Sequence, residues 1–505
     1  MKINGVLTNS SFCIRKNKYE DIINILKKYF TVEHAKNLFN EDKEPIIAYR
    51  EDDEYLYIPK FIANTEIIIN DITIKFKCKN TFYYPKEINL TFNKVLREEQ
   101  IKCVDYVINN FTDGVIEPKG GILNASCGTG KTIMSIYLVC ALKVKTLIIV
   151  HQEFLMTQWK NRIEEFCNAK VGIIQQKKME LDNDIVIGMV HTICAKEYTN
   201  EFDDFGLVIY DEVHHLGANY FSNVLMKTSC KYTIGLSATP KRTDNMHKII
   251  NLHIGDVLYT LKRDFSYKVA IKRIFFHSNN KLFVEKSRMI KGQSYPDVVQ
   301  MKTNLIKINT RNDLIIQIII KLQNINKKIF IFSDRIEHLT TLKEGVDLIL
   351  KENNLYNTNT CFYMGKTSKN DKEFAEQKGD IIFVSIKLGE EGLDIGHLDC
   401  VLFALPFKQA KTIEQVIGRI LRKEILNNLL QIPLVIDICD TFSIFKNWNI
   451  IRNTVYKKNK YFIQDYHFSD LEFKNNLDNN ILPMEYIFND MLDEQFIKKN
   501  LIIKE

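Results

Sequence analysis

The sequence predicts an α/β protein with two parallel sheets, each covered by helices on both faces, after a small α+β domain. Short apolar strands alternate with helical segments from about Leu90 to Leu261. The same alternation returns between roughly Leu314 and Asp440. The strand segments, among them KTLIIVH, FGLVIYDE and DIIFVSI, are runs of Val, Ile and Leu without polar alternation. Such runs are typical of strands buried on both faces, and therefore of parallel sheets.

The first 88 residues have a different pattern. A helical pattern covers Tyr19 to Leu26, and strands are expected in EYLYIPKF and TEIIINDITIKFKC. This stretch carries no recognisable chemistry, so we expect a small α+β domain that docks a substrate or a partner. The predicted domains are 1–88 for this accessory domain, 89–264 for the first α/β domain and 311–460 for the second. Residues 265–310, lysine-rich and weakly patterned, are expected to form a linker or small insertion, and residues 461–505 a C-terminal tail.

Composition narrows the function classes. At about 150 residues per domain, the 505 residues predict roughly three domains, and the net charge of +7 suits a polyanionic partner. The 11 cysteines include no C-x-x-C pair, which argues against zinc fingers and favours reduced thiols in a cytosol-like compartment. No signal peptide is evident, and the most apolar run, Leu314–Leu322, is too short to span a bilayer. A soluble intracellular protein without a membrane partner is expected.

The segment GGILNASCGTGKTIMSIYL predicts a nucleotide-phosphate site. A strand over Ile122–Ala125 would lead into a glycine-rich loop, and a helix would begin at Lys131. Backbone N–H groups of such a loop wrap a phosphate, and the positive end of the helix faces the anion. Lys131 would neutralise the β- and γ-phosphates of ATP, and the Thr132 hydroxyl would ligate Mg²⁺. The candidate residues of this loop are Ala125, Ser126, Cys127, Gly128, Thr129, Gly130, Lys131 and Thr132.

The segment FGLVIYDEVHH supplies two adjacent carboxylates. A strand over Leu207–Tyr210 would deliver Asp211 and Glu212 to its carboxyl end, where open α/β sheets bind their ligands. Asp211 would hold Mg²⁺ through water, and Glu212 would orient and deprotonate the attacking water. Read alone, such a pair is often a helix N-cap. Its position downstream of the phosphate loop favours the catalytic interpretation.

A third candidate is the segment EQVIGRILRKE. Gln415, Arg419 and Arg422 recur at i, i+4 and i+7, so they would project from one face of a helix. A face of this kind, turned toward a cleft, could present an arginine finger to the γ-phosphate. The alternative is a solvated amphipathic helix, which the spacing read alone favours slightly.

In this order, the segments from about Leu96 to Asp440 resemble superfamily 2 helicases. LREEQ, with Gln100, is similar to the adenine-reading segment, and ASCGTGKT is similar to motif I. The other matches are TLIIVHQEFLMTQW to motif Ia, DIVIGMVHT to Ic, DEVH to II, GLSATPKRTD to III, KIFIFSDR to IV, VSIKLGEEGLDI to V and Gln415–Arg422 to VI. The resemblance implies two tandem RecA-like domains, ATP and Mg²⁺ as cofactors, and nucleic acid as the partner.

The resemblance implies roles for residues outside these sites. Coupling of the ATP site to nucleic acid would use His214, Ser237 and Thr239. Gly392 and Asp394 would lie at the nucleotide cleft, with Asp394 near the ribose. Candidate contacts to the nucleic-acid backbone are Gln152, Thr192, Arg335 and Ser385. The ordinary alternative for these last four is that hydroxyls and amides at strand ends satisfy a turn.

Within the superfamily, the segments TQWK, GLSATPKRTDN and LVIDICDTFSIF are similar to the XPB-like branch. The poxvirus-type transcript-release helicases of large cytoplasmic DNA viruses are most similar in size and layout. This implies DNA rather than RNA as the track, RNA polymerase or transcription factors as further partners, and a host-cytoplasm or virion location if the source is viral. One departure is Arg242-Thr243-Asp244, where XPB proteins carry Arg-Glu-Asp, so strand-opening details specific to XPB are not carried over.

The expected mechanism uses two lobes that share one nucleotide. ATP would bridge Lys131 and Asp211 on the first lobe to Arg419 and Arg422 on the second, and hydrolysis would let the lobes reopen. An RNA helicase and the motor subunit of a restriction system remain open as alternatives. So does an inert nucleic-acid-binding scaffold, although intact Lys131, Glu212 and Arg419 argue against it.

Overall fold

The computed structural model describes residues 1–8, 10–33, 44–81, 85–114, 119–125, 128–198, 201–217, 219–228, 230–238, 247–261, 269–290, 292–386, 398–421, 433–470 and 488. The chain divides into two compact units, Met1–Arg263 and Asp264–Glu505, and each is treated by itself below. Among the described residues, no helix combines the length and apolar content that crossing a membrane requires.

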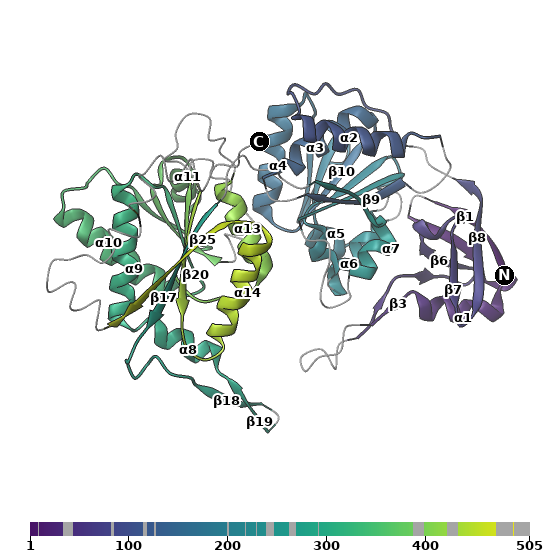
Figure 1. Ribbon diagram of the computed structural model, residues 1–505. Coiled ribbons are helices and arrows are strands. Elements are labelled where there is room, and N and C mark those ends of the chain that lie inside the picture. Colours follow the sequence, from purple (N-terminus) through teal and green to yellow (C-terminus); the bar gives the residue numbers. More distant parts are fainter. Residues whose placement is uncertain are drawn as a thin grey trace. The chain divides into compact units, whose positions relative to one another are not determined.

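The N-terminal part of unit 1 is a six-stranded sheet with one helix, α1 (Glu20–Tyr29), in the order β5-β6-β2-β1-β8-β7 (Figure 1). Its strands are β1 (Lys2–Leu7), β2 (Ser11–Arg15), β5 (Arg50–Glu51), β6 (Tyr55–Pro59), β7 (Glu66–Ile69) and β8 (Ile72–Thr81), and a separate pair is β3 (Thr31–Val32) and β4 (Ile46–Ile47). Alternation is clear in β6, where Leu56 and Ile58 are buried and Tyr55 and Tyr57 are partly exposed. This alternation reflects a sheet with one face packed on the core.

The rest of unit 1 is an eight-stranded sheet in the order β12-β11-β13-β10-β14-β15-β9-β16, parallel except for the short edge strand β12. Its strands are β9 (Lys119–Ala125), β10 (Thr146–Val150), β11 (Val171–Gln175), β12 (Lys178–Met179), β13 (Ile185–Met189), β14 (Leu207–Tyr210), β15 (Tyr232–Ser237) and β16 (Val257–Leu261). One face carries α2 (Glu98–Phe111), α3 (Lys131–Leu142) and α4 (Glu153–Phe166). The other carries α5 (Val190–Cys194), α6 (Asn219–Lys227) and α7 (His247–Ile254) (Figure 1).

A buried lysine connects the N-terminal sheet to this second sheet. Lys60, in a short 3₁₀ helix (Lys60–Ile62), is fully buried. Its ammonium donates to the Thr233 hydroxyl at 2.8 Å and to the Cys230 carbonyl. Burial lowers the pKa of Lys60 to about 7, because the charged form loses its hydration.

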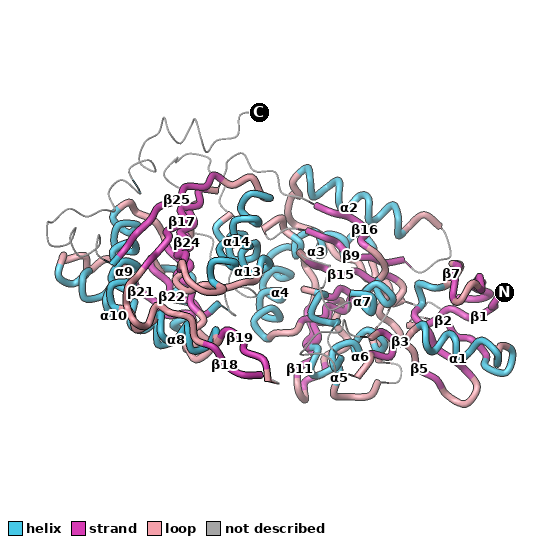
Figure 2. Tube along the Cα trace, turned by 60° about the horizontal axis from the view of Figure 1, so that its bottom comes forward, coloured by secondary structure: helices cyan, strands magenta, loops and turns pink. Residues whose placement is uncertain are grey.

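Unit 2 contains a seven-stranded, wholly parallel sheet in the order β21-β22-β20-β23-β24-β17-β25. Its strands are β17 (Ala270–His277), β20 (Ile329–Ser333), β21 (Thr360–Tyr363), β22 (Ile381–Ser385), β23 (Cys400–Phe403), β24 (Leu434–Asp440) and β25 (Phe462–Ser469). Helices α9 (Asn309–Asn324) and α10 (Ile336–Glu352) cover one face, and α13 (Ala410–Ile420) and α14 (Phe445–Lys458) the other, as Figure 2 shows. The remaining elements are the hairpin β18 (Ser287–Ile290) and β19 (Gln293–Pro296), α8 (Val298–Leu305) and α11 (Lys369–Lys378).

Two expectations about unit 2 are wrong. Residues 265–310 are more than a linker, because β17 lies inside the sheet between β24 and β25. Residues 461–505 are more than a tail, because β25 pairs with β17 along eight residues from Phe462 to Ser469. The apolar pattern of β17 is interrupted by Lys272 and Arg273, which have partners on β25: Lys272 donates to Gln464 and Tyr466, and Arg273 pairs with Asp465. These partners lie about 190 positions away in the sequence, so the local pattern did not reveal a buried strand.

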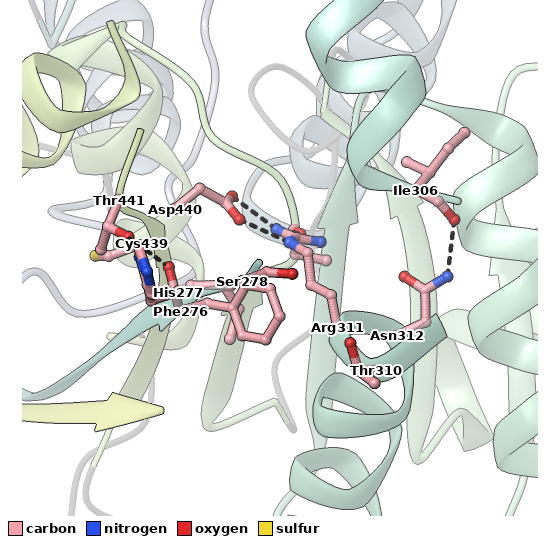
Figure 3. A network of polar contacts seen from close by, with 12 residues as sticks. Phe276, His277, Ser278, Ile306, Thr310, Arg311, Asn312, Cys439, Asp440 and Thr441 are labelled. Atoms are coloured by element: carbon pink, nitrogen blue, oxygen red, sulfur yellow. Dashed lines mark hydrogen bonds and ion pairs between the residues drawn. The ribbon is translucent and has the colours of Figure 1, made fainter. Parts of the chain in front are cut away.

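A buried polar network holds the carboxyl edge of this sheet together (Figure 3). The Arg311 guanidinium donates to both carboxylate oxygens of Asp440, at 2.8 and 2.9 Å, and to the Ala404 carbonyl at 2.8 Å. Both side chains of the ion pair are 0% exposed. One arginine on α9 therefore ties together the ends of β23 and β24.

Candidate functional site

The predicted phosphate loop joins a strand to a helix at the expected residues. β9 ends at Ala125, which is buried, and α3 begins at Lys131 after Gly130 in the left-handed conformation (φ +88°). A Cβ at Gly130 would lie 2.3 Å from Gln100 Nε2, and the positive φ would strain any residue with a side chain, so glycine is favoured there. Ser126 and Cys127 lie outside the described residues. The predicted strand–loop–helix order is confirmed on either side of them.

Two side chains from the start of α2 hold the phosphate loop in place. Gln100 Nε2 and Arg97 Nη2 donate to the Thr129 carbonyl, at 2.8 and 2.9 Å. Gln100 is 2% exposed, and its Oε1 accepts from the Arg97 backbone N–H at 2.9 Å. The structure therefore places Gln100 against the loop, while adenine recognition by Gln100 stays a prediction. Arg97 was not predicted, although it stands within the LREEQ segment.

The two carboxylates follow β14, which spans Leu207–Tyr210 as predicted. Lys131 Nζ lies 3.2 Å from Glu212 Oε1, so the end of β14 meets the first turn of α3. Glu212 has a left-handed backbone (φ +45°), which is uncommon for a residue with a side chain. Strained backbone of this kind clusters at functional sites, and here it accompanies a side chain that contacts Lys131.

Asp211 is held by two donors. Its Oδ1 accepts from the Glu212 backbone N–H at 3.0 Å, and its Oδ2 accepts from the Trp159 indole N–H at 2.8 Å. Burial raises the pKa of the Asp211 carboxyl, and the neighbouring Glu212 charge raises it further, whereas the Lys131 cation acts in the opposite direction. Trp159 was quoted in the TQWK segment, but no role at this site was predicted for it.

A polar chain links these carboxylates to the end of β15. His214 Nδ1 lies 3.3 Å from Glu212 Oε2 and 3.2 Å from Ser237 Oγ. His214 is 5% exposed and Ser237 is 0% exposed, so both side chains are shielded from bulk water. Lys131, Glu212, His214 and Ser237 thus form one continuous series of contacts, which we call the Lys131–Ser237 chain. Thr239, the third candidate coupling residue, lies outside the described residues.

The residues at this edge fit a magnesium–nucleotide complex. In the described part of the chain, no group of three or more His, Cys, Asp or Glu side chains is arranged to hold a metal by itself. Mg²⁺ is commonly bound by one or two carboxylates together with substrate phosphates and water. Asp211 and the half-buried Thr132 hydroxyl provide such oxygen ligands, and the N-terminus of the 12-residue helix α3 favours an anion.

The motif VI candidates lie in unit 2. Gln415 is 3% exposed within α13, and the backbone of Arg419 belongs to the same helix. Both residues therefore lie in one helix, while their projection toward a nucleotide stays a prediction. Arg422, Gly392 and Asp394 lie outside the described residues.

The four candidate nucleic-acid contacts are all near strand ends. Gln152 is the N-cap residue of α4, and Arg335 is the N-cap residue of α10. Ser385 is the last residue of β22. The Thr192 hydroxyl accepts from the Gln176 backbone N–H at 3.0 Å, so this hydroxyl also stabilises the turn after β11. Contact of these residues with nucleic acid stays a prediction.

Two family models match the chain. Residues 93–242 match the model for the res subunit of type III restriction enzymes, and residues 310–424 match the helicase conserved C-terminal domain. The first match covers the phosphate loop and the Asp211–Glu212 pair, and the second covers α13. Both predicted α/β domains therefore match known family models.

Individual proteins are similar over most of the chain. A protein of Acanthamoeba polyphaga mimivirus, provisionally named an ATP-dependent RNA helicase, is 33% identical over an alignment of 507 residues, gaps included, that covers 98% of this chain and 91% of that protein. The DNA 3'-5' translocase XPB2 of Sulfurisphaera tokodaii is 30% identical over 229 residues, or 43% of this chain and 51% of that protein. A solved fragment from Vibrio vulnificus, provisionally named an HsdR subunit of a type I restriction enzyme, superposes with a TM-score of 0.55 at 15% identity, covering 75% of this chain and 70% of that one. The predicted fold of two RecA-like domains is thereby confirmed.

Proposed function

Because this chain belongs to the superfamily 2 helicases, and is thus an ATP-hydrolysing enzyme that acts on nucleic acid, we propose that it is a DNA translocase that serves viral-type transcription or DNA repair. The observation that carries the ATPase part is the Lys131–Ser237 chain. It brings a cation, a candidate general base and a buried histidine–serine pair to one edge of the unit 1 sheet. Such a series can report the state of the nucleotide to residues beyond it.

Each residue then has a distinct task. Mg²⁺, when bound, would supply positive charge to the β- and γ-phosphates. Lys131 would leave Glu212 and neutralise the phosphates, and Asp211 and Thr132 would hold the metal. Glu212, released from Lys131, would orient the attacking water and accept its proton. His214 contacts Glu212 directly and Ser237 contacts it through His214, and in this proposal both would respond to this change.

The second unit would complete the site. Arg419, whose backbone lies in α13, and Arg422 would stabilise the negative charge that develops on the transferred phosphoryl group. Gly392 and Asp394 would border the nucleotide, and Gln100 would read the adenine. ATP binding would then favour closure and hydrolysis would favour reopening, which moves the backbone contacts stepwise along one strand.

DNA is proposed as the track because the segments from motif Ia through GLSATPKRTD resemble the XPB-like branch, and a relative that is similar over 43% of this chain is named a DNA translocase. RNA is the second candidate, favoured by the name of the mimivirus relative. The candidate contacts Gln152, Thr192, Arg335 and Ser385 are polar or basic side chains suited to phosphate and sugar, so we expect little dependence on base sequence. RNA polymerase or transcription factors would be further partners.

The test is ATPase stimulation by single-stranded DNA, duplex DNA and RNA of equal length across a salt series. A backbone-binding site should lose affinity with a log–log slope of about −0.7 per phosphate contacted on single strands. DNA should stimulate at lower concentration than RNA, and base composition should matter little. Stimulation by RNA alone would replace DNA by RNA as the track. No stimulation by any polynucleotide at low salt, with active ATPase, would refute movement on nucleic acid.

A further inference from the structure

The indole N–H of Trp159 donates a hydrogen bond to a carboxylate at the proposed ATP site. Trp159 lies in the second turn of α4, is 1% exposed, and donates to Asp211 Oδ2 at 2.8 Å. The other buried side chains of α4 are Leu155, Met156, Ile163 and Phe166, none of which carries a hydrogen-bond donor. The single polar group on the buried face of this helix therefore ends at the predicted metal-binding residue.

Packing alone does not explain this arrangement. Trp159 belongs to the apolar cluster between the sheet and the helices α2 to α4, together with Ile163 and Met134. A phenylalanine would serve that cluster without placing a donor beside the Asp211 carboxylate. An indole N–H is a donor only and carries no charge, so it orients a carboxylate without competing with a metal cation as a lysine would.

The two donors to Asp211 come from different elements. The Glu212 backbone N–H, in the residue that follows Asp211, donates to Oδ1. The Trp159 indole N–H, on α4 and 52 positions earlier in the sequence, donates to Oδ2. Together they define the plane of the carboxylate. Residues that contact a ligand residue in this way commonly change metal affinity when they are replaced.

We propose that Trp159 is a positioning residue that holds the Asp211 carboxylate in the orientation that binds the magnesium–nucleotide complex. The proposal rests on the proposed function for the role of Asp211. It adds a residue that touches neither the nucleotide nor the metal. Its consequence is that the magnesium-dependent part of nucleotide affinity depends on one indole N–H group.

The experiment measures binding of a fluorescent ADP to the full chain, without turnover, as Mg²⁺ is titrated from zero. Two variants are compared with wild type: Trp159→Phe, and Trp159→3-benzothienylalanine, which keeps the bicyclic shape and lacks the N–H. Trp448→Phe is the matched control, because Trp448 packs against Phe445 in unit 2. Thermal unfolding of each variant checks that the fold is intact.

Both Trp159 variants should require about 10-fold to 100-fold more Mg²⁺ for half-maximal ADP binding. ADP affinity without Mg²⁺ should stay at the wild-type value, because Lys131 and the phosphate loop set it. An unchanged magnesium requirement in the benzothienylalanine variant would overturn the proposal, as would equal losses with and without Mg²⁺. Wild-type ATPase that ignores all polynucleotides would instead refute the proposed function, while this binding result would stand separately.

Discussion

Lys131 Nζ lies 3.2 Å from Glu212 Oε1, and this contact joins the first turn of α3 to the residue pair that follows β14. The two side chains are only 13% and 16% exposed, so each charge depends on the other in place of water. In the proposed mechanism, a phosphate that attracts Lys131 weakens this contact. Nucleotide binding would then release the candidate base.

Substitution of each partner should separate binding from turnover. Lys131→Ala removes the cation from the phosphates, so ATP affinity should fall and turnover should stop. Glu212→Gln keeps the shape of the side chain and removes one negative charge next to the phosphates, so ATP should stay bound while hydrolysis stops. Fluorescent-nucleotide titration and steady-state ATPase measure the two effects. Equal ATP affinity in the two variants would contradict these assignments.

Arg419 tests the contribution of unit 2. Arg419→Ala should lower kcat by about 10³-fold, as loss of an arginine finger does, with a modest effect on ground-state ATP binding. Glu414→Ala is the matched control on the same helix, because Glu414 contacts only the exposed Lys458 among the described ion pairs, at 3.8 Å. A rate within about twofold of wild type for Arg419→Ala would show that this arginine lies on a solvated helix face and takes no part in catalysis.

The Arg311–Asp440 pair makes a prediction about stability. Both side chains are 0% exposed, so Arg311→Met leaves an uncompensated buried carboxylate, and the free energy of unfolding should fall by about 3–5 kcal/mol. Removing both charges in Arg311→Met with Asp440→Leu should recover part of the loss. Lys369→Met is the control, since it breaks an exposed pair with Glu373 and should cost under about 1 kcal/mol. Urea unfolding measures all three, and equal losses in the single and double variants would contradict the argument.

Local signals predicted the strands and the helix start at the candidate ATP site. The strand before the phosphate loop, the helix start at Lys131 and the strand Leu207–Tyr210 are all where the sequence indicated. Each depends on residues within one turn or one strand, where apolar runs and glycine have direct conformational consequences. The parallel sheets were predictable for the same reason.

Contacts between distant segments were not predictable. Lys272 and Arg273 made β17 resemble a linker, because their partners on β25 lie about 190 positions away. The Trp159–Asp211 hydrogen bond spans 52 positions, and no local pattern encodes it. A rare tryptophan at a buried helical position was the one signal available in the sequence. The hydrogen bond could not be inferred from this tryptophan without the fold, which brings α4 next to the residue that follows β14.

Lys60 makes stability depend on pH in a defined window. Its pKa is about 7 in the folded protein and near 10.5 in the unfolded chain, because burial removes the hydration of the ammonium group. Between these values the unfolded chain binds more protons, so the free energy of unfolding should rise with pH, by up to roughly 1.4 kcal/mol per unit. Below about pH 7 both states are protonated, and the buried charge destabilises the fold by a constant amount.

The measurement compares urea unfolding of wild type and Lys60→Met at about pH 7 and about pH 9. Other groups titrate in both proteins, so the difference between the two proteins isolates Lys60. Wild type should gain stability relative to Lys60→Met as the pH rises, and Lys75→Met, which changes a lysine side chain that is 63% exposed, should follow wild type. Parallel pH dependence in wild type and Lys60→Met would show that Lys60 keeps its ordinary pKa. In that case Lys60 would make its hydrogen bonds to Thr233 and Cys230 as a charged ammonium group at both pH values.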